Sequence, residues 1–336
     1  MIWTNILGWV QQAFPFAAFL ALAALGELLT EKSGSLNLGT PGTMCVGASA
    51  GFIAVYNYCQ AVGNPAVIVI LLLALGVSFC AAMLMGLLYS FFTVSLRINQ
   101  NVVGLVLTIF GCGLAEFLSI YFVKSESGNV NCDPAMRVFN AKIPFLSDKL
   151  GWFSDLFFQY GFMLYATIVL VILASLFLNR TRTGLHLRAV GENPGTADAA
   201  GINVTRYRYL ASSIGAGLVG IAGISYVMEF QAGSWSTANV STIEASGWLS
   251  VALVIFALWR PLNLLWCSLI FGFCYWAYIY LPAMGVQMAD GNLQSSLLKM
   301  LPYVITILVL IIVNLRKSKK NQGPASLGLS YFREER

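Results

Sequence analysis

The chain has 336 residues, of which 58% are hydrophobic and only 10% are charged, whereas average soluble domains are roughly 45–50% apolar and about 25% charged. A soluble fold could not bury this much apolar surface, so the composition indicates an integral membrane protein and argues against a water-soluble enzyme, a disordered chain or a nucleic-acid-binding module. The net charge of +5 comes from 19 Lys and Arg against 14 Asp and Glu, and its position along the chain is more informative than its sum.

Nine stretches are apolar enough to be considered as membrane spans, each of which needs ~20 mostly apolar residues. The third is long enough to tilt or to extend out of the membrane, and the seventh is short. We therefore predict an all-α, polytopic helical membrane protein with about nine (eight to ten) transmembrane helices in one bundle. In chain order the expected spans are residues 6–29, 38–56, 66–96, 102–123, 160–178, 207–227, 247–259, 262–281 and 297–315.

The basic residues predict the orientation. Four of them, Arg316, Lys317, Lys319 and Lys320, directly follow the last apolar stretch. With this tail placed in the cytoplasm, 14 of the 19 Lys and Arg residues lie on the cytoplasmic side, as the positive-inside rule requires. We expect a membrane domain over residues 1–315 with an outside N-terminus, an outer loop at about 124–159, a cytoplasmic loop at about 179–206, and a basic cytoplasmic tail over 316–336.

Small residues recur every three or four positions in three of the expected spans. This spacing places each set on one helix face, where small side chains let helix backbones approach closely in lipid. The pattern predicts a tightly packed bundle. The three sets are Ser78, Ala82, Gly86 and Ser90; Gly104, Thr108, Gly111 and Ala115; and Ser212, Ala216, Gly220 and Gly223.

The sequence offers no constellation for catalysis. It lacks the GxxxxGK[ST] and HExxH motifs, and its one histidine, His186, lies in the expected cytoplasmic loop. The seven cysteines form no CxxC pair, although Cys59 and Cys132 could both face outward and pair. We therefore expect no catalytic residue, no metal site and no cofactor bound by this chain.

Three carboxylates, Glu27, Glu116 and Glu229, lie within or at the ends of expected spans. A central charge in a span costs roughly 2.5–3.5 kcal/mol, so such a group should face the bundle interior or water. These carboxylates could line a transport path, or each could pair with a helix end or a hydroxyl near the interface.

Two polar breaks interrupt the apolar pattern. Residues 34–42 combine Gly, Asn and Pro, and Asn99-Gln100-Asn101 opens the fourth span. Irregular backbone at membrane depth is tolerated where it lines a cavity, often at a transporter binding site, although the first break could be a plain cytoplasmic turn. We take as candidate translocation-path residues Glu27, Asn37, Asn99, Asn101, Glu116 and Glu229.

The cytoplasmic loop carries the signals of a short helix. Asn193 is a good N-cap, Pro194 suits the first helical position, and Gly201 suits the position after the last. They predict a helix of about seven residues, roughly 10 Å long. So short a helix would be marginal alone and should be held by a partner or by the membrane domain. Its place suits it to receive force from another protein.

At this loop the sequence resembles a known family. The segments GLHLRAVGENP (184–194) and AAGI (199–202) resemble the coupling region of permease subunits of ABC importers in the branched-chain amino acid/simple sugar class. GELL at 26–29 and GSLNLG at 34–39 are similar to an early segment of that class. IPFLSD at 143–148 and PASLGLSY at 324–331 are similar to its nucleoside-importer subgroup.

The resemblance implies a bacterial inner-membrane transport core of two permeases, this chain with a paralogue or with itself, and ATP-binding-cassette ATPases that bind the ATP. An extracytoplasmic lipoprotein would deliver the small-molecule solute. Membrane lipid is the remaining expected partner, and no nucleic acid is expected. Ser246 departs from the family, which often has a basic residue before the pair at Gly247-Trp248. The implied ATPase-coupling residues are Arg188, Gly191, Glu192, Asn193, Pro194, Ala200 and Gly201.

The function expected from these observations is a permease subunit, not an enzyme, that imports a nucleoside, with a purine nucleoside favoured, or a simple sugar. The alternative is an ion-driven secondary transporter in which Glu27, Glu116 or Glu229 is the proton site.

Overall fold

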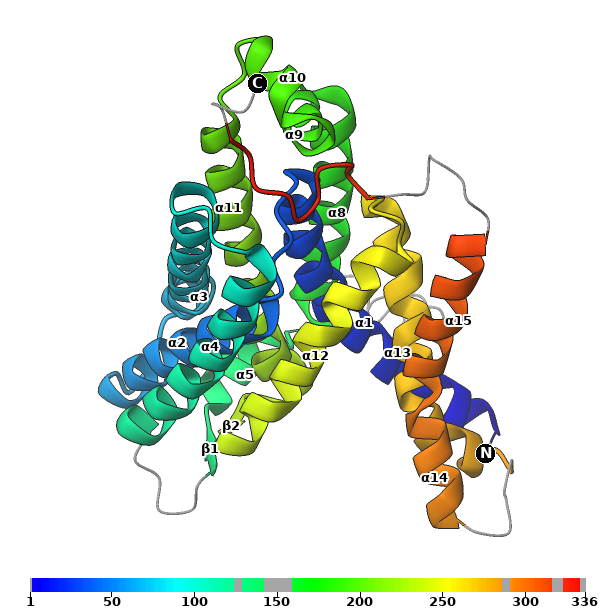
Figure 1. Ribbon diagram of the computed structural model, residues 1–336. Coiled ribbons are helices and arrows are strands. Elements are labelled where there is room, and N and C mark those ends of the chain that lie inside the picture. The colour runs from blue at the N-terminus through cyan, green and yellow to red at the C-terminus, as the bar shows by residue number, and fades with distance from the viewer. Residues whose placement is uncertain (1, 124–128, 142–158, 286–290, 316–322, 333–336) are drawn as a thin grey trace.

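The computed structural model describes residues 2–123, 129–141, 159–285, 291–315 and 323–332, and nearly all of them are helical (Figure 1). The first half contains α1 (Ile2–Lys32), α2 (Thr40–Ala61), α3 (Val67–Ser90), the π-helical turn η1 (Phe91–Ser95), α4 (Gln100–Val123), β1 (Asn129–Asn131) and α5 (Asp133–Phe139). The second half contains α8 (Phe162–Arg180), α9 (Arg182–Glu192), α10 (Pro194–Ala199), α11 (Val204–Ser225), the π-helical turn η2 (Tyr226–Phe230), β2 (Ser234–Ser236), α12 (Thr237–Phe256), α13 (Pro261–Ala283), α14 (Gly291–Lys299) and α15 (Leu301–Leu315).

Seven of the described helices are long and apolar enough to cross a membrane, which confirms a polytopic helical membrane protein. The count of about nine spans is not confirmed. The expected second span is α2, a helix of 22 residues that is not among the seven, and the expected ninth span is divided into α14 and the 15-residue α15.

The seventh span was placed too late in the sequence. The structure begins this helix, α12, at Thr237 instead of residue 247, and ends it at Phe256. Its first turns carry polar side chains such as Ser241 and Thr242, which mask the apolar signal that marks a span. Exposed polar side chains inside a membrane-spanning helix indicate that this part of α12 does not face lipid.

The stripes of small residues are where the helices approach most closely. A Cβ built on Gly86 of α3 would lie 2.6 Å from the carbonyl oxygen of Ser212 in α11, and one on Gly111 of α4 would lie 2.5 Å from the carbonyl oxygen of Gly42 in α2. Any side chain at either glycine would collide with backbone. The prediction of close packing through these stripes is confirmed for α3 against α11 and for α4 against α2.

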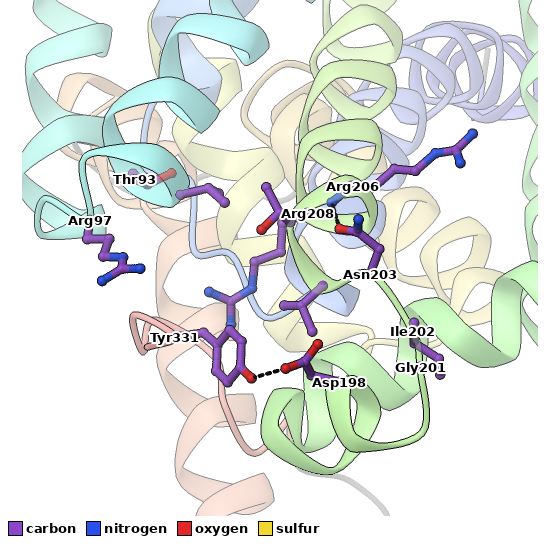
Figure 2. Close-up of a pocket in the computed structure, with 12 residues that line it drawn as sticks. Thr93, Arg97, Asp198, Gly201, Ile202, Asn203, Arg206, Arg208 and Tyr331 are labelled. Carbon is purple, nitrogen blue, oxygen red and sulfur yellow. Dashed lines mark hydrogen bonds between the residues drawn. The ribbon is translucent and has the colours of Figure 1, made fainter. Parts of the chain in front are cut away.

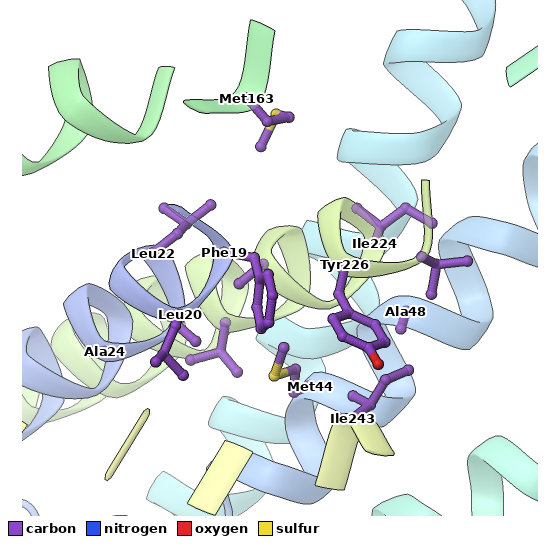
Figure 3. Close-up of a cluster of buried hydrophobic side chains, with 14 of the residues drawn as sticks. Phe19, Leu20, Leu22, Ala24, Met44, Ala48, Met163, Ile224, Tyr226 and Ile243 are labelled. Atoms are coloured by element: carbon purple, nitrogen blue, oxygen red, sulfur yellow. The ribbon is translucent and has the colours of Figure 1, made fainter. Parts of the chain in front are cut away.

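Helix α1 lies at the centre of the molecule rather than at its edge. Figure 3 shows Phe19, Leu20 and Leu22 of α1 among buried side chains of α2, α11 and α12, including Met44 and Ile243. By contrast α3, α4, α8 and α13 expose many large apolar side chains, as lipid-facing helices do.

The bundle has two distinct ends. Helices α9 and α10 and the C-terminal segment 323–332, which we call the tail strap, lie together at one end, called here the α10 end (Figure 1). The antiparallel pair β1–β2 lies at the other, called here the β end, with Val130 opposite Trp235. Gln100 of α4 contacts the strap and Thr237 of α12 follows β2, so α4 and α12 cross the bundle in opposite directions.

Candidate functional site

The short helix expected after Asn193 is present. Asn193 Oδ1 accepts a hydrogen bond from the Thr196 amide (3.0 Å), and Pro194 is the first residue of the six-residue helix α10. Gly201, which follows the C-cap Ala200, has a φ of +82°, a left-handed conformation that favours glycine. Asn193, Ala200 and Gly201 are exposed at the end of the molecule, so α10 is accessible to a partner protein.

A second helix of the same loop, α9, was not anticipated. Thr181 caps it, because its hydroxyl oxygen accepts a hydrogen bond from the Gly184 amide (3.0 Å). Leu187 and Val190 are buried on its inner face, three positions apart. A threonine cap followed by this spacing is a signal that could have identified α9 from the sequence.

Gly191, at the end of α9, fixes this loop against the membrane helices. A Cβ on Gly191 would collide with the carbonyl oxygen of Lys32, at the end of α1. The Gly191 carbonyl also accepts a hydrogen bond from the Ser326 amide of the tail strap (3.0 Å). Of its neighbours, Glu192 is exposed and Arg188 is half-buried with its Nε lacking a hydrogen-bond partner.

The tail strap ties α9 and α10 to the membrane helices. The Ala325 amide donates to Glu192 Oε2 (3.3 Å), and the Tyr331 hydroxyl donates to Asp198 Oδ2 on α10 (2.9 Å). The Leu329 carbonyl oxygen accepts hydrogen bonds from Gln100 Nε2 (3.4 Å) and Arg208 Nη1 (3.2 Å). Movement of α10 would therefore pull on α4 and α11.

The polar break between α1 and α2 is buried in protein and is not a turn in solvent. Glu27 accepts hydrogen bonds from the Asn37 amide (3.3 Å) and from the Thr40 hydroxyl. Asn37 Oδ1 in turn accepts from the Gly39 amide (2.9 Å). The structure thus brings Glu27 and Asn37 together in a network closed to solvent, and irregular backbone is tolerated at such a place because it is satisfied within the protein.

The polar residues that open α4 differ in their burial, and the buried one, Gln100, was not among the candidate site residues. Asn99 and Asn101 are exposed, and Asn99 Oδ1 only caps α4 by accepting from the Asn101 amide (2.9 Å). Gln100 between them is buried, and its Oε1 accepts from the Leu36 amide (2.7 Å). No local pattern indicates a contact between residues 64 positions apart.

Glu116 lies on the surface of the bundle, near a second carboxylate that sequence reasoning missed. Glu116 is seven residues from the end of α4 and Glu244 is seven from the start of α12, so each is about 10 Å from the β end of its helix. Cys45 joins the two helices, because its thiol donates to the Val240 carbonyl (3.6 Å) and accepts from the Cys112 thiol (3.7 Å). Glu116 is exposed and Glu244 is half-buried.

Glu229 is separate from the other candidates. It belongs to η2 near the β end, and its Oε1 accepts a hydrogen bond from the Met163 amide at the start of α8 (3.2 Å). A carboxylate bonded to a helix N-terminus in this way is the arrangement expected for pairing with a helix end.

Three arginines are among the residues that line a cavity of about 570 Å³ beside α10 (Figure 2). They are Arg97, Arg206 and Arg208, and Asp198 and Tyr331 close one side. Arg208 is buried, and only its Nη1 has a hydrogen-bond partner. This cavity opens at the end of the molecule that carries α10, which makes that end strongly basic.

Among the described residues, no group of three His, Cys, Asp or Glu side chains is placed to hold a metal ion. Cys59 and Cys132 are both free thiols. The segment 143–148 and the basic residues at 316–320 lie outside the described residues.

Comparison with known proteins identifies the family. The family described as "Branched-chain amino acid transport system / permease component" matches residues 11–312. The chain belongs to this family. It is therefore a multi-pass permease component of a transport system, and permeases of this kind work with ATPase and solute-binding partners.

Three relatives cover most of the chain. A putative glucose ABC transporter permease protein of Haloferax volcanii is 32% identical over 95% of both chains, and a nucleoside ABC transporter permease protein of Lactococcus lactis is 32% identical over 94% of both. A guanosine ABC transporter permease protein of Bacillus subtilis is 31% identical over 88% of both. No solved structure matches the chain.

Proposed function

We propose that this chain forms the membrane path of an ABC importer for a nucleoside, with a purine nucleoside favoured over a simple sugar, and that a separate ATPase drives it. The single observation that carries this proposal is α10: a capped, exposed helix at the end of the bundle, bonded through the tail strap to α4 and α11. The chain itself has no P-loop, so the nucleotide must be bound by a partner.

The same geometry gives α10 its role. A helix of six residues has little stability of its own, so it moves as part of whatever holds it. Here Asp198 is held by the strap and Gly191 by α1. An ATPase that grips α10 would shift α1, α4 and α11 together, and these helices would switch the path between outward and inward access. The α10 end, rich in arginine, would then be cytoplasmic.

Glu116 and Glu244 support a second permease subunit. Both lie well inside membrane-spanning helices, and a charge facing lipid there costs roughly 2.5–3.5 kcal/mol on insertion scales. Their shared surface on α4 and α12 should instead face water and a second permease, either a copy of this chain or a paralogue. The solute path would run along this surface, where carboxylate oxygens accept hydrogen bonds from hydroxyl groups of the solute.

The choice of solute rests on the relatives. Two of the three carry names for nucleoside or guanosine transport and one for glucose. Nucleosides and sugars share neighbouring hydroxyl groups, which suit a path lined with carboxylates. An extracytoplasmic lipoprotein would capture the solute and present it at the β end. The relatives argue against the alternative of an ion-driven carrier, because all three carry the names of ABC transporter permeases. Glu27 and Glu229, two of its three candidate proton sites, are bonded within the protein.

Uptake by living cells tests the solute. A strain that lacks this gene, and the same strain carrying it, are given labelled guanosine, adenosine, uridine and glucose. We expect the gene to restore purine nucleoside uptake, and unlabelled glucose in excess should not compete. Restoration of glucose uptake alone would contradict the assignment to nucleosides.

A further inference from the structure

A large apolar cleft opens between the helices on the flank of the α10 end. It has a volume of about 1100 Å³ and is bounded by α1, α8, α9 and α11. Its walls include the apolar side chains of Leu25 from α1, Leu173 from α8 and Ile214 from α11. Leu173 and Ile214 are exposed although both belong to membrane-spanning helices. The cleft therefore opens sideways, toward the hydrocarbon of the membrane, and not into the bundle.

The cleft has the length of one membrane leaflet. Along α11 it extends from Arg206 to Leu218, which is about 18 Å at 1.5 Å per residue. Half the thickness of a bilayer's hydrocarbon core is about 15 Å. An acyl chain that lay along the cleft would reach from the interface to about the middle of the membrane.

The mouth of the cleft is basic. Arg206, at the start of α11, lines it together with His186 of α9 and Asn203. Figure 2 shows the Arg206 side chain extending away from Asp198 and Tyr331, so the guanidinium points away from the acidic side chain of α10. His186 Nδ1 and the Tyr207 hydroxyl are 3.0 Å apart, which holds the ring in place at this rim. Among the described residues that line the cleft, none is acidic.

We propose that this cleft binds one anionic phospholipid, with its phosphate at Arg206 and its acyl chain between α1, α8 and α11. Basic pockets between membrane helices on the cytoplasmic side are suited to anionic head groups. Guanidinium groups bind phosphate oxygens in a bidentate manner, and apolar walls bury the chain. A second protein subunit on this surface would need an acidic side chain at Arg206, whereas an anionic lipid supplies the opposite charge in every copy.

The cleft lies directly beside the connection between α10 and α11, so a bound lipid would affect how firmly α10 is held. Ala200, Gly201 and Ile202, which connect α10 to α11, also line the cleft. A bound lipid would fill the space beneath this connection and brace it against α8. Loss of the lipid would leave α10 less firmly held when a partner pushes on it.

Bound lipid can be counted directly by native mass spectrometry of the full-length chain, purified in mild detergent together with its partner subunits. Arg206→Ala removes the basic mouth, and Ala174→Phe narrows the apolar part of the cleft while keeping all charges. The matched control is Arg182→Ala, which removes an exposed arginine of α9 that does not line the cleft. Thermal unfolding with and without added phosphatidylglycerol is measured on the same proteins.

We expect phosphatidylglycerol or cardiolipin to stay with the wild-type protein and with Arg182→Ala, and to raise their unfolding temperature. Retention should fall about fivefold in Arg206→Ala, the effect of one basic group near an anionic lipid, and should also fall in Ala174→Phe. Equal retention in all four proteins would overturn the proposal, as would equal retention of phosphatidylethanolamine. A disulfide formed between two copies that carry Leu173→Cys would show that a second subunit occupies the cleft and would also overturn it.

Discussion

At the scale of single residues, the contacts that hold the α9–α10 loop are made largely by backbone and by small side chains. Gly191 packs against the carbonyl of Lys32 with no room for a Cβ. Gly195, four positions later and inside α10, has ordinary space, since its nearest neighbour beyond the helix is Asn193 Oδ1 at 3.5 Å from a built Cβ. An added methyl group should therefore be harmful at Gly191 and tolerated at Gly195.

We predict that Gly191→Ala lowers the stability of the protein by about 1–3 kcal/mol, the usual cost of inserting a methyl group into a filled space. The substitution would also displace α9 from α1 and reduce uptake. Gly195→Ala should be tolerated, because alanine is a better helix former than glycine. Thermal unfolding in detergent and uptake in cells measure both effects. A loss of stability in Gly195→Ala as large as that in Gly191→Ala would contradict this account of the loop.

The carboxylates on α4 and α12 give a second prediction at this scale. Glu116→Gln and Glu244→Gln keep the size of the side chain and remove the charge. Each should reduce solute uptake about tenfold, because the amide oxygen of Gln still accepts a hydrogen bond but a charged acceptor contributes about 1–1.5 kcal/mol more than a neutral one. The control is Asp133→Asn at the start of α5, an exposed carboxylate at the β end outside the membrane-spanning helices. Normal uptake in both Gln variants would remove this surface from the path.

At the scale of elements, α10 depends on its cap. Replacing the capping side chain in Asn193→Ala costs about 1 kcal/mol, which is large for a six-residue helix. We expect nucleotide hydrolysis by the assembled transporter to continue while uptake per hydrolysed ATP falls. Asn193→Asp retains a capping oxygen and should behave almost as the wild type. Equal efficiency of Asn193→Ala and wild type would mean that α10 does not transmit force.

The tail strap is the second element with a mechanical role. Tyr331→Phe removes the hydrogen bond to Asp198, worth about 0.5–1.5 kcal/mol, and deletion of residues 323–336 removes every contact of the strap. We predict a modest loss of coupling in the substitution and a severe loss in the deletion, with the chain still inserted in the membrane. Leu329→Ala is the control, because its exposed side chain is dispensable and its backbone carbonyl makes the contacts.

At the scale of the whole molecule, the sequence was sufficient to predict most helices, because a helix that spans the membrane needs a long run of apolar residues. It was also sufficient for α10, because the residues that cap this helix are next to it in the sequence. It was insufficient for side chains whose burial and bonding depend on residues far away in the sequence. Gln100 and Arg208 are buried and bond to the strap, which lies more than 100 residues away along the chain, and no local pattern shows this. Glu244 was missed because the polar start of α12 was placed outside the seventh span.

The central claim of this account is that the chain does not supply the energy for transport itself, and that the ATPase of the complete assembly does. The described residues show a capped α10 and an end of the bundle that is rich in arginine. The most direct test uses sealed vesicles that contain the purified chain, either alone or with its permease, ATPase and lipoprotein partners, and measures accumulation of labelled nucleoside against a gradient. We predict accumulation only in vesicles with the ATPase and hydrolysable ATP on the α10 side. Uphill accumulation by the chain alone, driven by an ion gradient, would contradict the account.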